Sequence, residues 1–375
     1  MIDLDYTANT PVDERVLARF CETERLCIGN ANSRHAAGRQ AAEILHASLR
    51  HMAQMLGAKE TEIIQTSGAS ESNNTAIKGI LRASRHVGRH VITTPLEHAS
   101  VSGCLTAMQE QGARIDVVSI DRQGRVNLDE LAELLRRDTV LVTISAVDSE
   151  LGVVQPVREI ARMLEAYPHC RLHVDATQAV GKIPISFQYA DTMSLAAHKF
   201  YGLNGVGLLL RREDVGMEPL IHGGVSASLY RSGTPPVGLA AATETALEIA
   251  LNEQPARYER VQKLNARLRA ALAVCPKVAI NSPEHAIPHV LNLSVQNVKG
   301  TVFQRELDAK GVCVSVKSAC SSDGLPSRAV FAVSRDRRNA LSSWRISLSH
   351  LTTEDEIKAF LQAFDVCYRE LTAVH

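Results

Sequence analysis

The fold class follows from the stretch Leu172-His173-Val174-Asp175-Ala176-Thr177-Gln178, in which a short apolar run ends at an acidic residue. On both sides of it, similar short runs rich in β-branched residues alternate with longer segments of helical periodicity. This alternation is typical of βαβ units and predicts an α/β fold with a mainly parallel, seven-stranded sheet. Strands are predicted at residues 62–65, 90–94, 115–120, 140–145, 172–174, 192–195 and 207–210, and helices at residues 36–57, 73–85, 101–111, 128–136 and 157–166.

A second, smaller domain is indicated beyond the Gly- and Pro-rich residues 222–236. A long helical pattern runs from about residue 239 to residue 274, and it is followed by predicted strands at 289–294 and 312–315 and a predicted helix at 352–371. We therefore expect a large domain, residues 14–250, and a smaller α+β domain made of residues 1–13 and 251–375.

Composition and charge exclude several classes of protein. Among the 375 residues, 41 are Lys or Arg and 41 are Asp or Glu, whereas proteins that neutralise nucleic-acid phosphates normally carry a basic excess. No apolar run reaches the roughly 18–20 residues of a membrane span, and the start of the chain does not resemble a signal peptide. The eight cysteines are scattered and offer no C-x-x-C pair, so we expect reduced thiols, no metal site and a cytoplasmic protein.

Three segments carry side chains suited to catalysis. Residues 66–74 follow a predicted strand and open a helix, whose N-terminus suits a phosphate group, although an ordinary Ser- or Thr-capped helix start fits equally well. Asp175 stands at the carboxyl end of a predicted strand, where open α/β sheets bind ligands, unless it only caps the next helix. Lys199 follows another apolar strand beside His198, where desolvation would make its amine a Schiff-base nucleophile. Asp175 could pair with a pyridine nitrogen, Lys199 could form an imine with an aldehyde, and residues 66–74 could bind a phosphate. Together these groups indicate pyridoxal 5′-phosphate as the cofactor.

In these segments the chain resembles class V aminotransferase-fold enzymes, which are fold-type I pyridoxal-phosphate-dependent transferases, and more closely the cysteine desulfurases of the NifS/IscS type. The resemblance runs almost end to end and includes residues 4–13, Gly29-Asn30, 66–74, Glu97-His98, 152–155, 173–178, His198-Lys199, 231–234, 318–322 and 343–347. It implies a homodimer that binds pyridoxal 5′-phosphate and uses L-cysteine as its substrate.

The resemblance also implies roles for individual residues. Lys199 would bind the cofactor through an imine and move protons, His98 would lie over the cofactor ring and exchange protons, and Cys320 would take the substrate sulfur as a persulfide. Asp175 would hold the pyridinium proton, and Gln178 would bond the phenolic oxygen. The implied cofactor-binding residues are Ala69, Ser70, His98, Ser149, Asp175, Gln178, His198, Lys199 and Thr234, the last reaching the phosphate of the neighbouring protomer. The implied substrate-binding residues are Asn9 and Arg345, whose planar fork suits a carboxylate.

The chain departs from the family pattern at four places. An Asn that normally contacts the cofactor is Ser149, with Asp148 beside it, and a Ser before the His-Lys pair is Ala196. The cysteine loop begins Val316-Lys317, and the chain ends at His375, where housekeeping desulfurases extend further and dock the iron–sulfur scaffold protein. We therefore expect a sulfur-acceptor protein that serves iron–sulfur assembly, tRNA thiolation or DNA phosphorothioation, with no direct contact to nucleic acid or to a membrane.

The predicted activity is removal of sulfur from L-cysteine, which gives L-alanine and a Cys320 persulfide. Ser149 motivates an alternative, namely a different class V enzyme on the same scaffold, such as a C–S lyase, an epimerase or a C–C or C–N bond-forming enzyme. A third interpretation is a non-catalytic subunit that only binds a partner. It conflicts with the joint presence of Lys199, Asp175, His98, Cys320 and Arg345.

Overall fold

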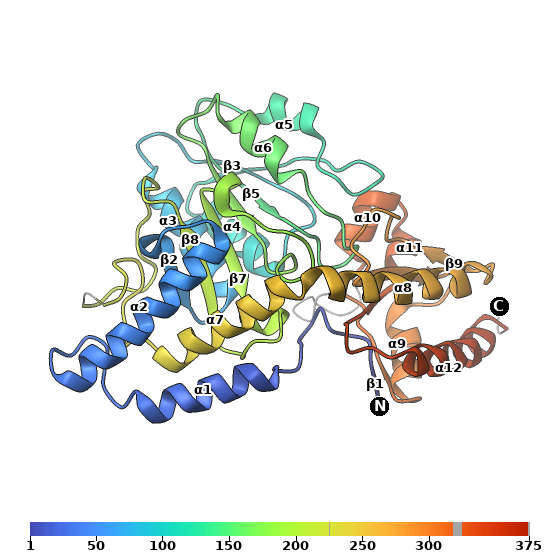
Figure 1. Cartoon of the computed structure of the whole chain (residues 1–375). Helices are drawn as coiled ribbons and strands as arrows, with labels where there is room; N and C mark the ends of the chain where they lie inside the picture. The colour runs from blue at the N-terminus through green and yellow to red at the C-terminus, as the bar shows by residue number, and fades with distance from the viewer. Residues whose placement is uncertain (225, 318–324, 374–375) are drawn as a thin grey trace.

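A seven-stranded sheet lies at the centre of the computed structural model, which describes residues 1–224, 226–317 and 325–373 (Figure 1). Its strand order is β2-β8-β7-β6-β5-β3-β4, and all neighbouring strands are parallel except that β8 runs antiparallel to β2 and β7. The strands are β2 (Ile63–Thr66), β3 (His90–Thr93), β4 (Arg114–Val117), β5 (Thr139–Ser145), β6 (Arg171–Asp175), β7 (Thr192–Ala196) and β8 (Gly207–Arg211). The predicted α/β fold with a mainly parallel sheet is confirmed.

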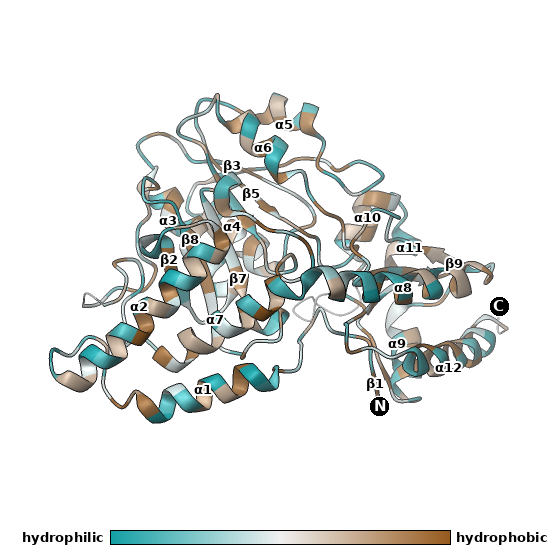
Figure 2. Cartoon of the chain, in the orientation of Figure 1, coloured by the Kyte–Doolittle hydropathy of each residue, from teal (hydrophilic) through white to brown (hydrophobic). Residues whose placement is uncertain are grey.

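Most inner strands of the sheet are buried along their whole length, because helices pack on the sheet. Every residue of β3, β5, β7 and β8 is buried, as expected of strands covered on both faces. Helices of this part are α1 (Glu14–Leu26), α2 (Ala36–Leu56), α3 (Ala69–Ala83), α4 (Ala99–Glu110), α5 (Leu128–Leu134), α6 (Val157–Leu164) and α7 (Val237–Asn252), with 3-10 turns η1 (Glu60–Glu62), η2 (Phe187–Tyr189) and η3 (Ala197–Lys199). Outer helices such as α2 carry hydrophilic and hydrophobic residues side by side (Figure 2), so each can bury one face.

The single helix predicted over residues 239–274 is wrong, because the structure has two helices there. Helix α7 ends at Asn252, and α8 (Gln254–Ala273) begins after Glu253. Pro255 occupies the first turn of α8. Its ring and its missing N–H are tolerated at a helix start but not inside a continuous helix. The two helices together run from beneath the central sheet to the far end of the molecule (Figure 1).

The second part of the fold is built on a small antiparallel sheet of order β12-β10-β9. Its strands are β9 (Val278–Ile280), β10 (Val290–Val295) and β12 (Ser343–Ser347), and its helices are α9 (Gly300–Asp308), α10 (Arg328–Ser334), α11 (Arg337–Ser342) and α12 (Glu354–Thr372). Trp344 of β12 stacks on Phe303 of α9 with ring centroids 5.0 Å apart, and Phe364 of α12 packs against both. Aromatic pairs of this kind contribute beyond their buried area.

The chain start joins the two parts. Strand β1 (Ile2–Asp3) pairs in parallel with β11 (Val312–Cys313), and the following residues run along β12 toward the edge of the large sheet. Backbone and side chain of Thr10 both donate to the carbonyl oxygen of His198, at 3.0 and 2.9 Å. The N-terminal residues therefore lie at the carboxyl ends of the parallel strands, where open α/β sheets bind ligands. Across the described ranges, no helix is long and apolar enough to cross a membrane.

Candidate active site

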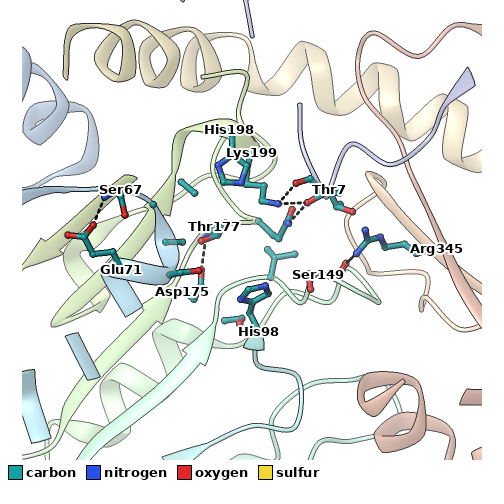
Figure 3. A pocket seen from close by; sticks show the side chains of 18 residues that line it. Thr7, Ser67, Glu71, His98, Ser149, Asp175, Thr177, His198, Lys199 and Arg345 are labelled. Atoms are coloured by element: carbon teal, nitrogen blue, oxygen red, sulfur yellow. Dashed lines mark hydrogen bonds between the residues drawn. The ribbon is translucent and has the colours of Figure 1, made fainter. Parts of the chain in front are cut away.

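Asp175 ends strand β6, and its carboxylate is held by two hydrogen bonds, of which Figure 3 shows the one from Thr177. Its Oδ2 accepts from Nδ2 of Asn73 on α3 at 2.8 Å, and its Oδ1 accepts from the backbone N–H of Thr177 at 3.0 Å. The amide oxygen of Asn73 accepts from Nε2 of His173 at 3.0 Å. Asn73 is fully buried, so this network fixes the carboxylate at the mouth of the sheet.

The start of helix α3 forms an open backbone cradle. Its N-cap is Gly68, with φ of 149° and no side-chain cap, so the helix N-terminus is left available to an anion. Strand β8 passes very close by: a Cβ on Gly207 would lie 2.6 Å from the Cα of Gly68. Glu71 in the first turn is ion-paired with Arg231 at 3.1 Å, which offsets its negative charge beside the cradle.

Lys199 lies in η3, directly after β7, and its side chain reaches the N-terminal segment (Figure 3). The Nζ atom donates to the carbonyl oxygens of Thr7 at 2.8 Å and Ala8 at 2.6 Å. The neighbouring His198 is half-buried, and burial, followed by repulsion from Lys199 and Lys182, lowers its pKa to about 4. The His198 ring is therefore neutral near pH 7.

His98 begins helix α4 and lies in a defined tautomer. Its Nδ1 accepts from the backbone N–H of Ser100 at 3.1 Å, so a neutral ring carries its proton on Nε2. Burial lowers the pKa of His98, an effect that Asp175 opposes and Lys199 reinforces. The neutral form is thus favoured near pH 7, and one nitrogen remains to donate or exchange a proton.

Arg345 of β12 brings a buried positive charge to the same place. Its Nη1 donates to the carbonyl oxygen of Ser149 at 2.9 Å, and its Nη2 is ion-paired with Oδ1 of Asp5, also at 2.9 Å. The other oxygen of Asp5 accepts from Oγ of Ser315 at 2.6 Å. Beside Ser149, Asp148 is buried, and burial followed by repulsion from Glu150 raises its pKa to about 7.

These groups surround one cavity of about 350 Å³ at the carboxyl ends of the sheet strands (Figure 3). Among the residues implicated by sequence, those that line it are Ala69, Ser70, His98, Ser149, Asp175, Gln178, His198, Lys199 and Arg345. Asn9 and Thr234 do not line it and have exposed side chains. Cys320 lies outside the described residues.

The chain matches a protein family and solved structures along nearly all of its length. Residues 2–360 match the family Aminotransferase class-V. The chain belongs to this family. It is 38% identical over 365 residues to the protein "Cysteine desulfurase IscS" of Escherichia coli (strain K12 / DH10B), covering 95% of this chain and 90% of that protein. A solved structure named "NIFS-LIKE PROTEIN" is 34% identical with a TM-score of 0.91 and covers 99% of both chains.

Within the class V aminotransferases, these similarities place the chain among the cysteine desulfurases of the NifS/IscS type. A further structure, "SspA in complex with cysteine", is 27% identical with a TM-score of 0.83, covering 94% of this chain and 100% of that one. Enzymes of this family depend on pyridoxal 5′-phosphate.

The residues of this class V enzyme fit pyridoxal 5′-phosphate. The Gly68–Gly207 cradle, which a Cβ on Gly207 would fill, has the space and the N–H groups for a phosphate. Lys199 supplies an amine, and Asp175 supplies a fixed carboxylate at the same cavity. The Oγ1 of Thr177, another lining residue, is buried and finds no hydrogen-bond partner in the described part of the chain. A bound polar group would satisfy that hydroxyl.

Sequence reasoning missed several groups of the site. The carbonyl oxygens of Thr7 and Ala8 hold Lys199, yet backbone acceptors occur at every residue and leave no mark in the sequence. Asn73 lies in residues 66–74, where the sequence indicated only a phosphate-binding or capped helix start, yet its amide holds Asp175. Thr177 lies between Asp175 and Gln178, and this position next to two implicated residues is the one feature of the sequence that points to it as a site residue.

Proposed function

We propose that this cysteine desulfurase converts L-cysteine into L-alanine and stores the sulfur as a persulfide on Cys320. The observation that supports this most is the convergence of Lys199, Asp175, His98 and Arg345 on one cavity. A catalytic amine, a proton-exchanging ring and a carboxylate-binding guanidinium are the groups that such a reaction of an amino acid needs.

Each side chain has a defined task in this proposal. Bound pyridoxal 5′-phosphate supplies the electron sink that labilises bonds of the substrate. Asp175, fixed by Asn73, holds a proton on the pyridine nitrogen. Lys199 moves protons at its Nζ, and Nε2 of His98 exchanges the proton needed to prepare the thiol.

The sulfur transfer balances without an added oxidant. The thiolate of Cys320 attacks the sulfur of the substrate, a sulfur–sulfur bond forms, and the carbon–sulfur bond breaks. The bonding electrons stay with the substrate carbon, which takes up a proton. One L-cysteine and one thiol thus give one L-alanine and one persulfide.

The described residues on either side of Cys320 support its access to the cavity. Ser315 exchanges backbone hydrogen bonds with Arg345 at 2.6 and 3.2 Å. Oγ of Ser327 donates to Glu150 at 2.5 Å, next to Ser149. Cys320 is five residues from Ser315 and seven from Ser327 in the sequence.

The proposal is tested by the products formed from L-cysteine. Wild-type enzyme should release L-alanine and, with a reductant, an equal amount of sulfide, and intact-mass measurement should find one extra sulfur atom per chain. Cys320→Ala should abolish both, whereas Cys313→Ala, which alters another free cysteine on β11, should retain them. Sulfide release by Cys320→Ala at the wild-type rate would favour the C–S lyase alternative.

We also propose a cytoplasmic homodimer that hands its sulfur to an acceptor protein in iron–sulfur assembly, tRNA thiolation or DNA phosphorothioation. The family resemblance implies that Thr234 reaches the phosphate bound by the neighbouring protomer. Thr234 is exposed and does not line the cavity of its own chain, which supports this role and therefore the dimer. Light scattering should give twice the chain mass of 40.8 kDa. A measured mass of one chain at micromolar concentration would contradict the dimer.

For the domains we propose a large unit, residues 14–250, and a small unit of residues 1–13 and 251–375. One buried apolar cluster supports this division, because it joins Leu4 to residues between Val261 and Cys367. Limited proteolysis followed by mass spectrometry should produce fragments that end near residues 13 and 250.

A further inference from the structure

Lys182 is a buried lysine that the proposed reaction does not use. Only 7% of its surface is exposed. Lys182 follows residues 173–178, the segment that contains Asp175 and Gln178. Its Nζ donates to Oε1 of Gln178 at 2.8 Å. Burial, followed by repulsion from Lys199 and Arg345, lowers its pKa to about 7, and Lys182 in turn lowers the pKa of His198 and His289. Burying a polar amine costs free energy, so the contacts of Lys182 in the fold require a physical explanation.

The contacts of Lys182 determine which way the amide of Gln178 points. A backbone carbonyl can only accept, so the group of Gln178 that lies 3.0 Å from the carbonyl oxygen of Thr7 must be the Nε2 amide. The Oε1 atom then faces the donating amine of Lys182. Both neighbours favour the same orientation: the carbonyl oxygen of Thr7 can only accept from the amide, and the protonated amine of Lys182 can only donate to it.

The amide of Gln178 shares an acceptor with Lys199 and also faces the cavity. The carbonyl oxygen of Thr7 that accepts from Gln178 also accepts from Nζ of Lys199 at 2.8 Å. Gln178 lines the cavity, and Nε2 has a second N–H beyond the one given to Thr7. With its oxygen engaged by Lys182, Gln178 can offer the cavity an N–H donor and not a carbonyl oxygen.

We propose that Lys182 is a positioning residue, which locks the amide of Gln178 so that its Nε2–H meets the phenolic oxygen of pyridoxal 5′-phosphate. The proposal rests on the proposed function only for the presence of that cofactor in the cavity. Without Lys182, only the carbonyl oxygen of Thr7 would oppose the flipped amide. A flipped amide would turn its own oxygen toward the cofactor oxygen, and the repulsion would weaken binding.

A double-mutant cycle on cofactor binding tests this proposal. The variants are Lys182→Met, which keeps the length of the side chain and removes the donor, Gln178→Ala, and the two combined. We measure the dissociation constant of pyridoxal 5′-phosphate and the pH midpoint of the bound cofactor's absorption band. Each single variant should weaken binding roughly 5- to 30-fold. The double variant should resemble Gln178→Ala, because Lys182 acts only through that amide.

Two further variants make the outcome decisive. Lys182→Gln keeps a donor and should recover most of the affinity and the absorption midpoint. If Lys182→Met does not fold, Lys182→Leu, which also removes the donor, takes its place. Lys263→Met removes a lysine that is 74% exposed and should change nothing. Additive losses in the double variant, or an unshifted midpoint in Lys182→Met, would overturn the proposal. Because no readout uses desulfuration, a failed proposal for Cys320 would leave these results intact.

Discussion

The guanidinium of Arg345 and the carboxylate of Asp5 form an ion pair at 2.9 Å, although 340 residues separate them in the chain. Arg345 is only 2% exposed, while its Nε has no hydrogen-bond partner in the described residues. The pair and the carbonyl oxygen of Ser149 hold two of the three guanidinium nitrogens, so the orientation of Arg345 is set in advance for the carboxylate that we propose it binds.

Replacing the carboxylate of this pair should weaken substrate binding. Asp5→Asn removes the charge and one of the two acceptor oxygens of a side chain that makes a part-buried hydrogen bond to a cation, worth about 1.5–3 kcal/mol. We expect kcat/KM for L-cysteine to fall roughly 10- to 100-fold, mainly through KM, in steady-state alanine assays. Asp355→Asn changes an acid whose side chain is 88% exposed and should leave both constants unchanged. An unaltered KM in Asp5→Asn would contradict a positioning role.

Removing the amide of Asn73 should destabilise the folded chain and loosen Asp175. Asn73→Ala removes the amide partner of two buried atoms, Oδ2 of Asp175 and Nε2 of His173. Each unsatisfied buried group costs about 1–3 kcal/mol. Urea unfolding should therefore give a clearly lower free energy of unfolding, and Asn32→Ala, at an exposed position, should not. Equal stability of the two variants would argue against the network.

A methyl group on Gly207 should close the cradle at the start of α3. Its Cβ would lie 2.6 Å from the backbone of Gly68 and also 2.6 Å from the carbonyl oxygen of Leu195, and neither can yield as a flexible side chain could. Gly207→Ala should lose cofactor absorbance and melt at a lower temperature. Gly103→Ala provides the control, because its Cβ meets nothing within 4 Å and α4 should gain up to about 1 kcal/mol.

Glu97 should make stability depend on pH in a defined direction. Its carboxyl accepts from Thr94 and Ser145, yet complete burial raises its pKa from 4.5 to about 7, with Asp175 adding to the rise. Between these pH values the unfolded chain has lost a proton that the folded chain keeps. The contribution of Glu97 is therefore greatest below pH 4.5 and declines as pH rises toward 7.

The isosteric variant Glu97→Gln isolates this effect. The difference in unfolding free energy between wild type and variant should shift against the wild type by up to about 3 kcal/mol from pH 4.5 to pH 7. Urea unfolding at several pH values measures it. A difference that stays constant over this range, or that changes in the opposite direction, would show that the pKa of Glu97 is not raised.

The sequence by itself determined the α/β fold, the order of the strands of the large sheet and of the helices between them, and residues that face the cavity from the ends of strands, but it did not predict helix α1. Asp175 and Lys199 could be recognised because a polar residue directly after a buried strand of a parallel sheet must emerge at the sheet's carboxyl edge. The sequence did not predict the break between α7 and α8. The helical periodicity continues across this break, whereas Pro255 favours the start of a new helix.

Only the tertiary structure decided which groups hold those residues in place. The contacts of Lys199 with Thr7, of Arg345 with Asp5 and of Asp175 with Asn73 join positions at least 102 residues apart. The acceptors at Thr7 and Ala8 are main-chain carbonyls, which no side-chain pattern announces. Lys182 reads in the sequence as an ordinary surface lysine. Tertiary packing buries Lys182, and burial strengthens its hydrogen bond to Gln178 compared with the same bond in water.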